Sequence, residues 1–328
     1  MLKILQDGSL KILESLSKDV TLSFGSENGN LDVLEHFAEI LCNEPPEYVS
    51  LLNHELDRGI SFPKARENAL LMYLNDIRKY ANVLSGSNNI LGIEYLKAIK
   101  QLKSKVVPVT IKRNSVDYNS LETVGGFASA TAIRNLVQNN EDIKEFVPEA
   151  SYKIVSEQIK YGKIVPSLSC FEKEILYTLR KMTALEISNL SDVTEGLGNR
   201  IKDAADSCNT LEDLISIIKT KRYTRTRIQR ILLYSMLNIT KKDIMDSYKI
   251  KPYLRVLGCN SNGKKLLSEI NTSKNTIITS VKRFMDKNNN KALKSMLDKD
   301  ILASNLYTLG YDFDSKANLD FTKRMIVI

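Results

Sequence analysis

Apolar residues recur at helical spacing over most of the chain, and only two short apolar runs in its first part have the character of buried strands. Leu10, Leu13 and Leu16 fall on one face of a predicted first helix, because residues three and four apart share a helix face. The runs at 20–24, which ends at Gly25, and at 106–111 predict two strands. Helices are predicted between them at 31–43, 46–58 and 62–75 and from Asn88 onward.

The pattern changes after Pro148, where one short amphipathic helix follows another and no strong strand is predicted before 253–257. Strands alternating with helices are typical of an α/β sheet, whereas helices alone must pack against one another. The sequence therefore predicts an α/β protein with a strand-containing domain over 1–148 and a mainly α-helical domain over 149–328. The later helices are predicted at 150–161, 169–182, 184–190, 197–207, 210–220, 224–239 and 241–248.

The composition is that of a globular protein and argues against several other classes. Hydrophobic residues make up 43% of the 328 residues and charged residues 26%, so an ordered core is expected. The four cysteines form no Cys-x-x-Cys pair, which argues against a zinc site and a disulfide framework. No apolar run approaches the roughly 18 residues of a membrane span, and the N-terminus lacks a signal-peptide pattern. We therefore expect a cytoplasmic protein.

A basic segment at 219–230 concentrates the positive charge of a chain whose formal net charge is +8. It holds six basic residues and no acidic one, which suits a polyanion such as nucleic acid. With Thr224 as a helix cap, the apolar positions from Ile228 onward form a buried stripe. Arg227, Arg230 and Tyr234 then share another face. The six candidate RNA-binding residues are Lys219, Lys221, Arg222, Arg225, Arg227 and Arg230.

The alternative for this segment is a solvated charged helix edge. Against it, the acidic residues expected at i,i+4 spacing are missing. A second basic contact is open at Arg200 and Lys202, although Arg200 is equally explained by an ion pair with Glu195 or Asp203.

Three positions at the ends of predicted elements suggest a ligand site in the first domain. Gly25 ends the first strand, Arg113 follows the second, and Asn88 opens the helix between them. Ligands of open α/β sheets bind outside the carboxyl ends of the strands, so we expect the three residues to line one rim. Read alone, Asn88 is equally explained as a helix N-cap.

A hydroxyl-rich helix start at Ser129–Arg134, after a loop at Gly125-Gly126, is a further candidate. The free N–H groups and the positive dipole end of a helix suit a phosphate, and Thr131 and Arg134 would support it. Taken alone, a plain capped helix explains this pattern as well.

Five motifs in a fixed order resemble one known family, the bacterial tRNA(Met) cytidine acetate ligases, which are HIGH-type nucleotidyltransferases. They cover most of the chain. The motifs are Phe24 to Glu27, Ser87 to Tyr95, Ala128 to Arg134, Lys219 to Tyr234, and Pro252 to Gly258.

The resemblance implies ATP-dependent acetylation of the wobble cytidine of elongator tRNA(Met) through an acetyl-adenylate. ATP and acetate are then substrates, and Mg²⁺ is a possible ion accompanying ATP. The basic segment would bind the tRNA. No residue stands out as a general base, so catalysis is expected to rest on positioning and charge stabilisation. The implied ATP-binding residues are Gly25, Asn88, Arg113, Thr131 and Arg134.

The family's His-x-Gly-His motif has no counterpart in this sequence, since the two histidines, His36 and His54, lie inside predicted helices. The resemblance thus covers only the later part of the family's nucleotide domain, and it implies that 1–148 is a partial Rossmann-like nucleotidyltransferase domain. We expect the 328 residues alone to be inactive, with a separate N-terminal fragment as a candidate partner. Two alternatives stay open: a non-catalytic tRNA-binding protein, which would not bind ATP, and a structural helical scaffold, which would not show salt-dependent RNA binding.

Overall fold

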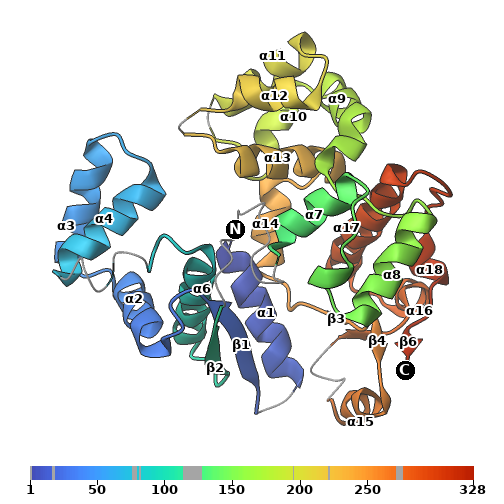
Figure 1. Ribbon diagram of the computed structural model, residues 1–328, viewed down its shortest axis with the longest axis horizontal. Helices are drawn as coiled ribbons and strands as arrows, with labels where there is room; N and C mark the ends of the chain where they lie inside the picture. Colours follow the sequence, from blue (N-terminus) through green and yellow to red (C-terminus); the bar gives the residue numbers. More distant parts are fainter. Residues whose placement is uncertain are drawn as a thin grey trace. The chain divides into compact units, whose positions relative to one another are not determined.

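The chain forms two units, each with its own core (Figure 1). Unit 1 comprises 1–118, 252–277 and 327–328, and unit 2 comprises 119–251 and 278–326. A boundary near 148 between a nucleotide-binding and an RNA-binding domain stays a prediction. The structure is a computed structural model that describes residues 2–16, 19–75, 80, 83–113, 128–194, 196–220, 222–270 and 276–328.

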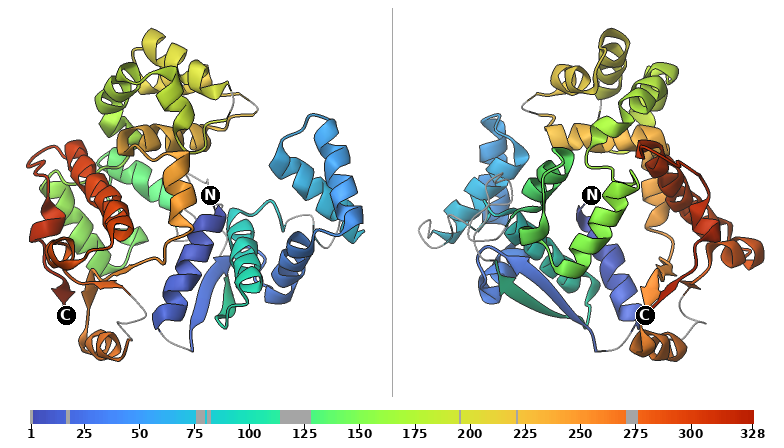
Figure 2. Two further views of the ribbon diagram at one scale, coloured as in Figure 1. Left: turned by 180° about the vertical axis from the view of Figure 1, so that it is seen from behind. Right: turned by 45° about the vertical axis from the view of Figure 1, so that its right-hand side comes forward.

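Two parallel strands form the sheet of unit 1, close to where the apolar runs predict them. β1 (Thr21–Ser26) pairs with β2 (Val107–Lys112), with Thr21 opposite Val107 and Ser26 opposite Lys112. Helices α1 (Leu2–Leu16) and α6 (Ser87–Leu102) lie side by side against one face of this sheet (Figure 2). The predicted α/β fold class is confirmed.

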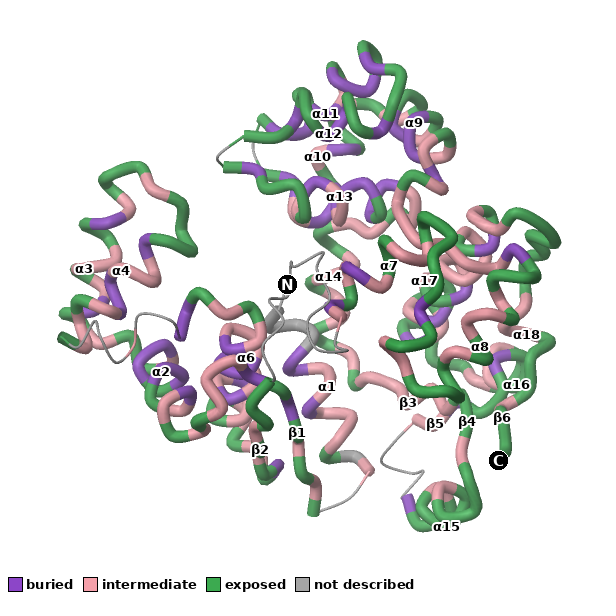
Figure 3. The backbone as a smooth tube through the Cα atoms, in the orientation of Figure 1, coloured by how far each residue is buried: buried purple, intermediate pink, exposed green. Residues whose placement is uncertain are grey.

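Burial alternates along β1, as the colours in Figure 3 show, so the two faces of the β1–β2 sheet differ in exposure. Phe24 and Ser26 are buried on the face toward α6. The other face, called here the open sheet face, consists of Thr21, Ser23, Gly25, Val107, Val109 and Ile111. Its three large apolar residues are 57%, 42% and 62% exposed, in chain order. Parallel sheets are normally covered on both faces, so this exposure is unusual.

The rest of the unit 1 core lies between α6 and α2 (Leu31–Asn43), where Phe37, Ile93 and Leu96 are buried. Asn30 caps α2 by accepting a hydrogen bond from the backbone of Val33. A helix pair and short strands complete the unit. These elements are α3 (Pro46–Asp57), α4 (Phe62–Leu74), β3 (Leu254–Arg255), β4 (Gly258–Cys259) and α15 (Ser261–Glu269). β3 pairs with β5 (Ile277–Ile278) and β4 with β6 (Ile326–Val327), and one residue each of β5 and β6, Ile278 and Ile326, is assigned to unit 2.

Unit 2 is helical in the residues that the structure describes, and α9 to α13 share its largest apolar cluster. Threonine side chains cap α10, α12, α13 and α14, which places helix starts where the sequence offers a hydroxyl before an apolar stripe. The helices are α7 (Ala130–Gln138), α8 (Glu149–Lys160), α9 (Glu172–Lys181), α10 (Ala184–Asn189), α11 (Leu197–Ser207), α12 (Leu211–Ile218), α13 (Arg225–Leu237), α14 (Lys241–Ser247), α16 (Val281–Lys287), α17 (Lys291–Tyr307) and α18 (Leu319–Thr322), with 3₁₀ turns at Lys144–Phe146, Leu168–Phe171 and Thr308–Gly310.

Candidate functional site

The parallel pairing of β1 and β2 brings Gly25 and Arg113 together at the carboxyl edge of the sheet. Gly25 lies opposite Ile111 in the register, and the Arg113 N–H donates to the Ser26 carbonyl at 2.9 Å. A Cβ atom on Gly25 would lie 3.3 Å from the Arg113 Cγ atom. The side chain of Arg113 therefore runs directly past Gly25, and it is exposed.

Ser26 fixes the backbone at this edge. Its hydroxyl lies 2.7 Å from the Thr110 hydroxyl on β2 and accepts a hydrogen bond from the Gly29 N–H at 3.0 Å. Gly29 has a φ of +72°, and a Cβ atom there would lie 2.6 Å from the Lys112 Cβ atom. Glycine is needed for both reasons. The loop after β1 is therefore held against the end of β2.

Glu27 joins this loop to the start of α6. One carboxylate oxygen accepts from the Asn88 backbone at 3.1 Å and from the Asn88 side-chain amide at 2.7 Å. The other oxygen accepts from the Asn89 backbone at 2.7 Å. Asn88 thus lies beside the loop that carries Gly25. The interpretation of Asn88 as a helix N-cap is wrong, because Gly86 occupies the cap position and the Glu27 carboxylate binds the first free N–H groups.

The environment of Glu27 favours its ionised form. Burial opposes the charge, but the hydrogen bonds from Asn88 and Asn89 outweigh this effect and hold the pKa of Glu27 below its usual value. A Cβ atom on Gly86 would lie 2.5 Å from the carboxylate, so the close approach requires glycine at that position. An ionised carboxylate at the N-terminus of α6 also complements the helix dipole. The same charge disfavours a phosphate on these N–H groups.

Ser129 begins α7 and accepts a hydrogen bond from the Ala132 backbone at 3.0 Å, which makes it the cap of this helix. Thr131 is half-buried and Arg134 is exposed in the first turns. Both belong to unit 2, whereas Gly25, Asn88 and Arg113 belong to unit 1. The structure therefore brings three of the five predicted ATP-binding residues to one rim. Gly125 and Gly126 lie outside the described residues.

The basic segment begins α13 as the sequence predicts. Thr224 caps the helix by accepting from the Arg227 backbone at 3.4 Å, and Ile228 and Ile231 are fully buried. Tyr234, expected beside Arg227 and Arg230, is buried as well. Burial raises the pKa of Tyr234, and Asp192 adds to that rise.

Acidic and carbonyl partners for three arginines come from other parts of unit 2. Arg225 makes a bidentate ion pair with Glu212, with both N–O distances at 2.6 Å. Arg230 Nε lies 2.6 Å from the Asp192 carboxylate. Arg227 donates to the Asp192 carbonyl at 2.7 Å. The absence of acids within the segment therefore does not mean that its arginines are unpaired.

The remaining basic residues of the segment differ from these three arginines in their surroundings. Lys219 and Arg222 are exposed, and neither has a carboxylate within ion-pair distance among the described residues. The Arg222 guanidinium lies 5.8 Å from the centre of the Tyr223 ring, which leaves its donors open. Lys221 lies outside the described residues.

Arg200 makes no ion pair with Asp203 among the described residues, Glu195 lies outside them, and a contact of Arg200 with RNA stays a prediction. The Arg200 guanidinium donates to the carbonyls of Ile217 and Ile218, at the C-terminus of α12. Lys202 lies 3.0 Å from the Asp206 carboxylate. Both side chains stabilise the helical packing of unit 2.

Metal-ligand clusters and membrane-spanning helices are both absent from the described residues. In the part of the chain that the structure describes, no group of three or more His, Cys, Asp or Glu residues is arranged to hold a metal ion. Nor is any described helix long and apolar enough to cross a membrane. The rim at Gly25 and the basic segment stay the two candidate sites.

Known proteins similar to this chain place it in one family. Residues 3–320 match the HIGH Nucleotidyl Transferase family. The tRNA(Met) cytidine acetate ligase of Acetivibrio thermocellus is 39% identical over 333 residues, covering 98% of this chain and 80% of the relative. The ligase of the same name from Caldanaerobacter subterraneus is 41% identical over 317 residues, covering 96% of this chain and 77% of the relative.

Solved structures of the same family are similar to this chain as well. The apo crystal structure of Thermotoga maritima TmcAL has a TM-score of 0.88 to this chain at 28% identity, over 99% of this chain and 80% of that one. The structure of Thermotoga maritima TmcAL bound with alpha-thio ATP has a TM-score of 0.85 to this chain at 27% identity. That match covers 98% of this chain and 80% of the other. The match extends through both units rather than over a single motif. The chain therefore belongs to the tRNA(Met) cytidine acetate ligase family of HIGH nucleotidyltransferases.

Proposed function

We propose that the protein uses ATP and acetate to acetylate the wobble cytidine of elongator tRNA(Met), through an acetyl-adenylate and with release of pyrophosphate. The observation that carries this proposal is the 39–41% identity to tRNA(Met) cytidine acetate ligases over at least 96% of the chain. The name of these relatives states the tRNA, the base and the acetyl donor. The similar Thermotoga maritima protein holds alpha-thio ATP.

The rim of unit 1 supports a nucleotide site at Gly25, Asn88 and Arg113. The Arg113 guanidinium is exposed and runs past a glycine, so a triphosphate could approach both the backbone and the charge. The amide nitrogen of Asn88 is engaged by Glu27, which leaves its side-chain oxygen as the acceptor for a ligand donor. Thr131 and Arg134 are proposed to bind the phosphates, with Mg²⁺ as the accompanying ion.

We assign tRNA binding to the basic segment, through Lys219, Lys221, Arg222, Arg225, Arg227 and Arg230. The side chains of Lys219 and Arg222 are exposed and have no carboxylate within ion-pair distance among the described residues. Arg225, Arg227 and Arg230 are held in fixed positions by Glu212 and Asp192. A phosphate that contacts them must share these guanidinium groups with their internal partners.

The open sheet face supports a second part of the proposal. Val107, Val109 and Ile111 present an apolar surface on a parallel sheet, where a covering layer is the normal arrangement. We propose that the 328-residue polypeptide by itself is inactive and that a further segment, packed on this face, completes the nucleotide site.

Two binding measurements test the proposal against its rivals. Calorimetry with ATP is expected to show binding, and a non-catalytic tRNA-binding protein would show none. Binding of elongator tRNA(Met) is expected to weaken steeply as salt rises, because phosphate contacts release counterions. A helical scaffold with an incidental basic segment would show no such dependence. Absence of both ATP and tRNA binding would contradict the proposed function.

A further inference from the structure

The outer face of α9 carries an exposed tyrosine between two lysines. Lys173, Tyr177 and Lys181 lie four residues apart and so share one face of the helix. The Tyr177 side chain is 67% exposed, and both lysines are exposed. Ile175 and Leu179, on the inner face, are fully buried. The inner face therefore anchors α9, and its outer face is left for another role.

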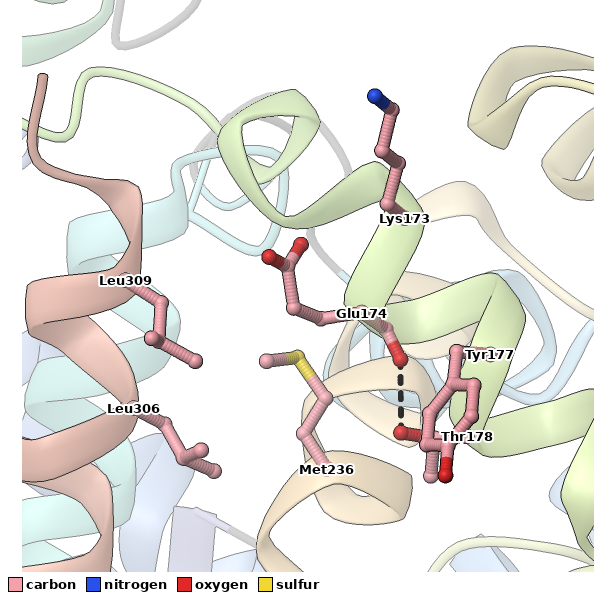
Figure 4. Close-up of a pocket in the computed structure, with 7 residues that line it drawn as sticks. All are labelled: Lys173, Glu174, Tyr177, Thr178, Met236, Leu306 and Leu309. Carbon is pink, nitrogen blue, oxygen red and sulfur yellow. Dashed lines mark hydrogen bonds between the residues drawn. The ribbon is translucent and has the colours of Figure 1, made fainter.

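Two cavities flank this tyrosine, and Lys173 and Tyr177 line both. The first has a volume of about 430 Å³ and the second about 510 Å³. Figure 4 shows the first, with side chains of α9 and α13 facing Leu306 of α17 and Leu309 of the 3₁₀ turn that follows it. Its other lining residues are Glu174, Thr178, Met236, Leu306 and Leu309. The second cavity is completed by Leu176, Arg180, Lys181 and Asn209.

The charges on this face are available to a partner. Among the described residues, neither Lys173 nor Lys181 has a carboxylate within ion-pair distance. This distinguishes them from Arg225 and Arg230, whose charges are paired within unit 2. Two exposed lysines without an ion pair, on either side of an exposed ring, favour a polyanion with flat apolar groups over a neutral protein surface.

We propose that the outer face of α9 binds an unpaired stretch of RNA, with one base stacked on Tyr177 and the flanking phosphates on Lys173 and Lys181. Every base offers a π face, so stacking on a tyrosine is tolerant of sequence. The inference rests on the proposed function, in which the RNA is the tRNA substrate. It adds a contact surface separate from the basic segment 219–230.

The first cavity suits a base rather than a phosphate. Met236, Leu306 and Leu309 make its lining apolar, and the Glu174 carboxylate would repel a phosphate. That carboxylate can accept a hydrogen bond from the exocyclic amino group of a base. The Thr178 hydroxyl is already engaged, since it donates to the Glu174 carbonyl at 2.7 Å. Glu174 is therefore the carboxylate in this cavity that would select among bases.

Fluorescence anisotropy tests this surface with two probes, elongator tRNA(Met) and a short single-stranded RNA. Tyr177→Leu keeps an apolar side chain but removes the π face, and it is expected to weaken both complexes about tenfold, within the range for loss of one stacked base. Tyr177→Phe retains stacking and should bind like the wild type. Lys173→Ala and Lys181→Ala should each lower the log-log salt slope by about 0.7–0.9.

Leu185→Ala is the matched control, because Leu185 is 72% exposed on the neighbouring α10 and has no π face. The affinity of Leu185→Ala for both RNAs should equal that of the wild type. Thermal unfolding of every variant shows that the fold is unchanged. Unchanged affinity of Tyr177→Leu for both RNAs overturns this inference while leaving the proposed function standing. Failure of the wild type to bind tRNA overturns both.

Discussion

Replacing Glu27 by glutamine is expected to loosen the start of α6 and to weaken ATP binding. The Glu27 carboxylate accepts three hydrogen bonds, two from Asn88 and one from the Asn89 backbone, at 2.7–3.1 Å. Glutamine keeps only one acceptor oxygen. Its amide nitrogen would face an N–H donor, so one donor of the helix start loses its partner.

The magnitude follows from these contacts. Loss of a capping interaction costs about 1 kcal/mol, and a donor left without an acceptor costs about 1–3 kcal/mol when buried. Glu27 is only partly buried, and water compensates for part of the loss. A net effect of about 2 kcal/mol is expected. If this whole free energy is needed to hold Asn88 in its ATP-binding position, the affinity for ATP falls by a factor of about 30.

The pH dependence gives an independent check. Hydrogen bonding holds the pKa of Glu27 below its usual value in the folded protein, despite the opposing effect of burial. The stabilisation is therefore present above the unfolded pKa of about 4.3, and it is lost as pH falls through the lower folded pKa. Glu27→Gln lacks this titration. The difference in unfolding free energy between the two proteins should shrink as pH falls through that range.

Calorimetry with ATP and urea unfolding at several pH values measure these effects. Glu47→Gln is the matched control, because Glu47 lies in the first turn of α3 but is exposed. Its removal changes a helix-dipole charge without disturbing α6. If Glu27→Gln behaves like Glu47→Gln in stability and in ATP affinity, then Glu27 does not organise the site.

Three further outcomes are expected. Gly92→Ala should lower the unfolding free energy by about 1–3 kcal/mol, since its Cβ atom would lie 2.5 Å from the Phe24 ring. Gly8→Ala, in open space within α1, should raise the unfolding free energy by roughly 0.5–1 kcal/mol. Equal effects of Gly92→Ala and Gly8→Ala in urea titrations would contradict the packing at Phe24. Replacing Lys219 and Arg222 by alanine should lower the log-log salt slope of tRNA binding by about 0.9 for each lost phosphate contact, and an unchanged slope would remove both from the interface. Arg222→Ala should weaken tRNA binding more than Arg230→Ala, and the reverse order of affinities would show that the Asp192 pair does not restrain Arg230.

The sequence predicts the fold well where the signal is local. The apolar runs place β1 and β2 to within two residues, and parallel pairing then requires Gly25 and Arg113 to lie at one edge. Thr224 is recognisable as a helix cap because its effect reaches only three residues along the chain.

Contacts between distant residues are where sequence patterns fail. Glu27 reaches Asn88 across 61 residues, and the only hint is that both belong to motifs of one family. Arg225 pairs with Glu212 across 13 residues and Arg230 with Asp192 across 38. A search for acids at i,i+4 spacing cannot find such partners, because tertiary packing brings them together.

Sequence patterning also could not identify the outer face of α9. In the sequence, Lys173 and Tyr177 occupy ordinary polar positions of an amphipathic helix, and the cavity between α9, α13 and α17 is what distinguishes them. Their environment depends on Met236 and Leu306, which are far away in the chain. Helix periodicity predicts that Tyr177 is exposed but not what surrounds it.

Acetylation of elongator tRNA(Met) with labelled acetate and ATP tests the central claim most directly. The assay compares the 328-residue chain alone with the chain mixed with, or fused to, the N-terminal segment of a family relative. A tRNA whose wobble cytidine is replaced by uridine is the control. ATP-dependent label is expected only on the cytidine tRNA and only with the added segment. Robust label from the chain alone would contradict the role assigned to the open sheet face. No label in either preparation, with tRNA binding intact, would contradict the proposed ligase activity.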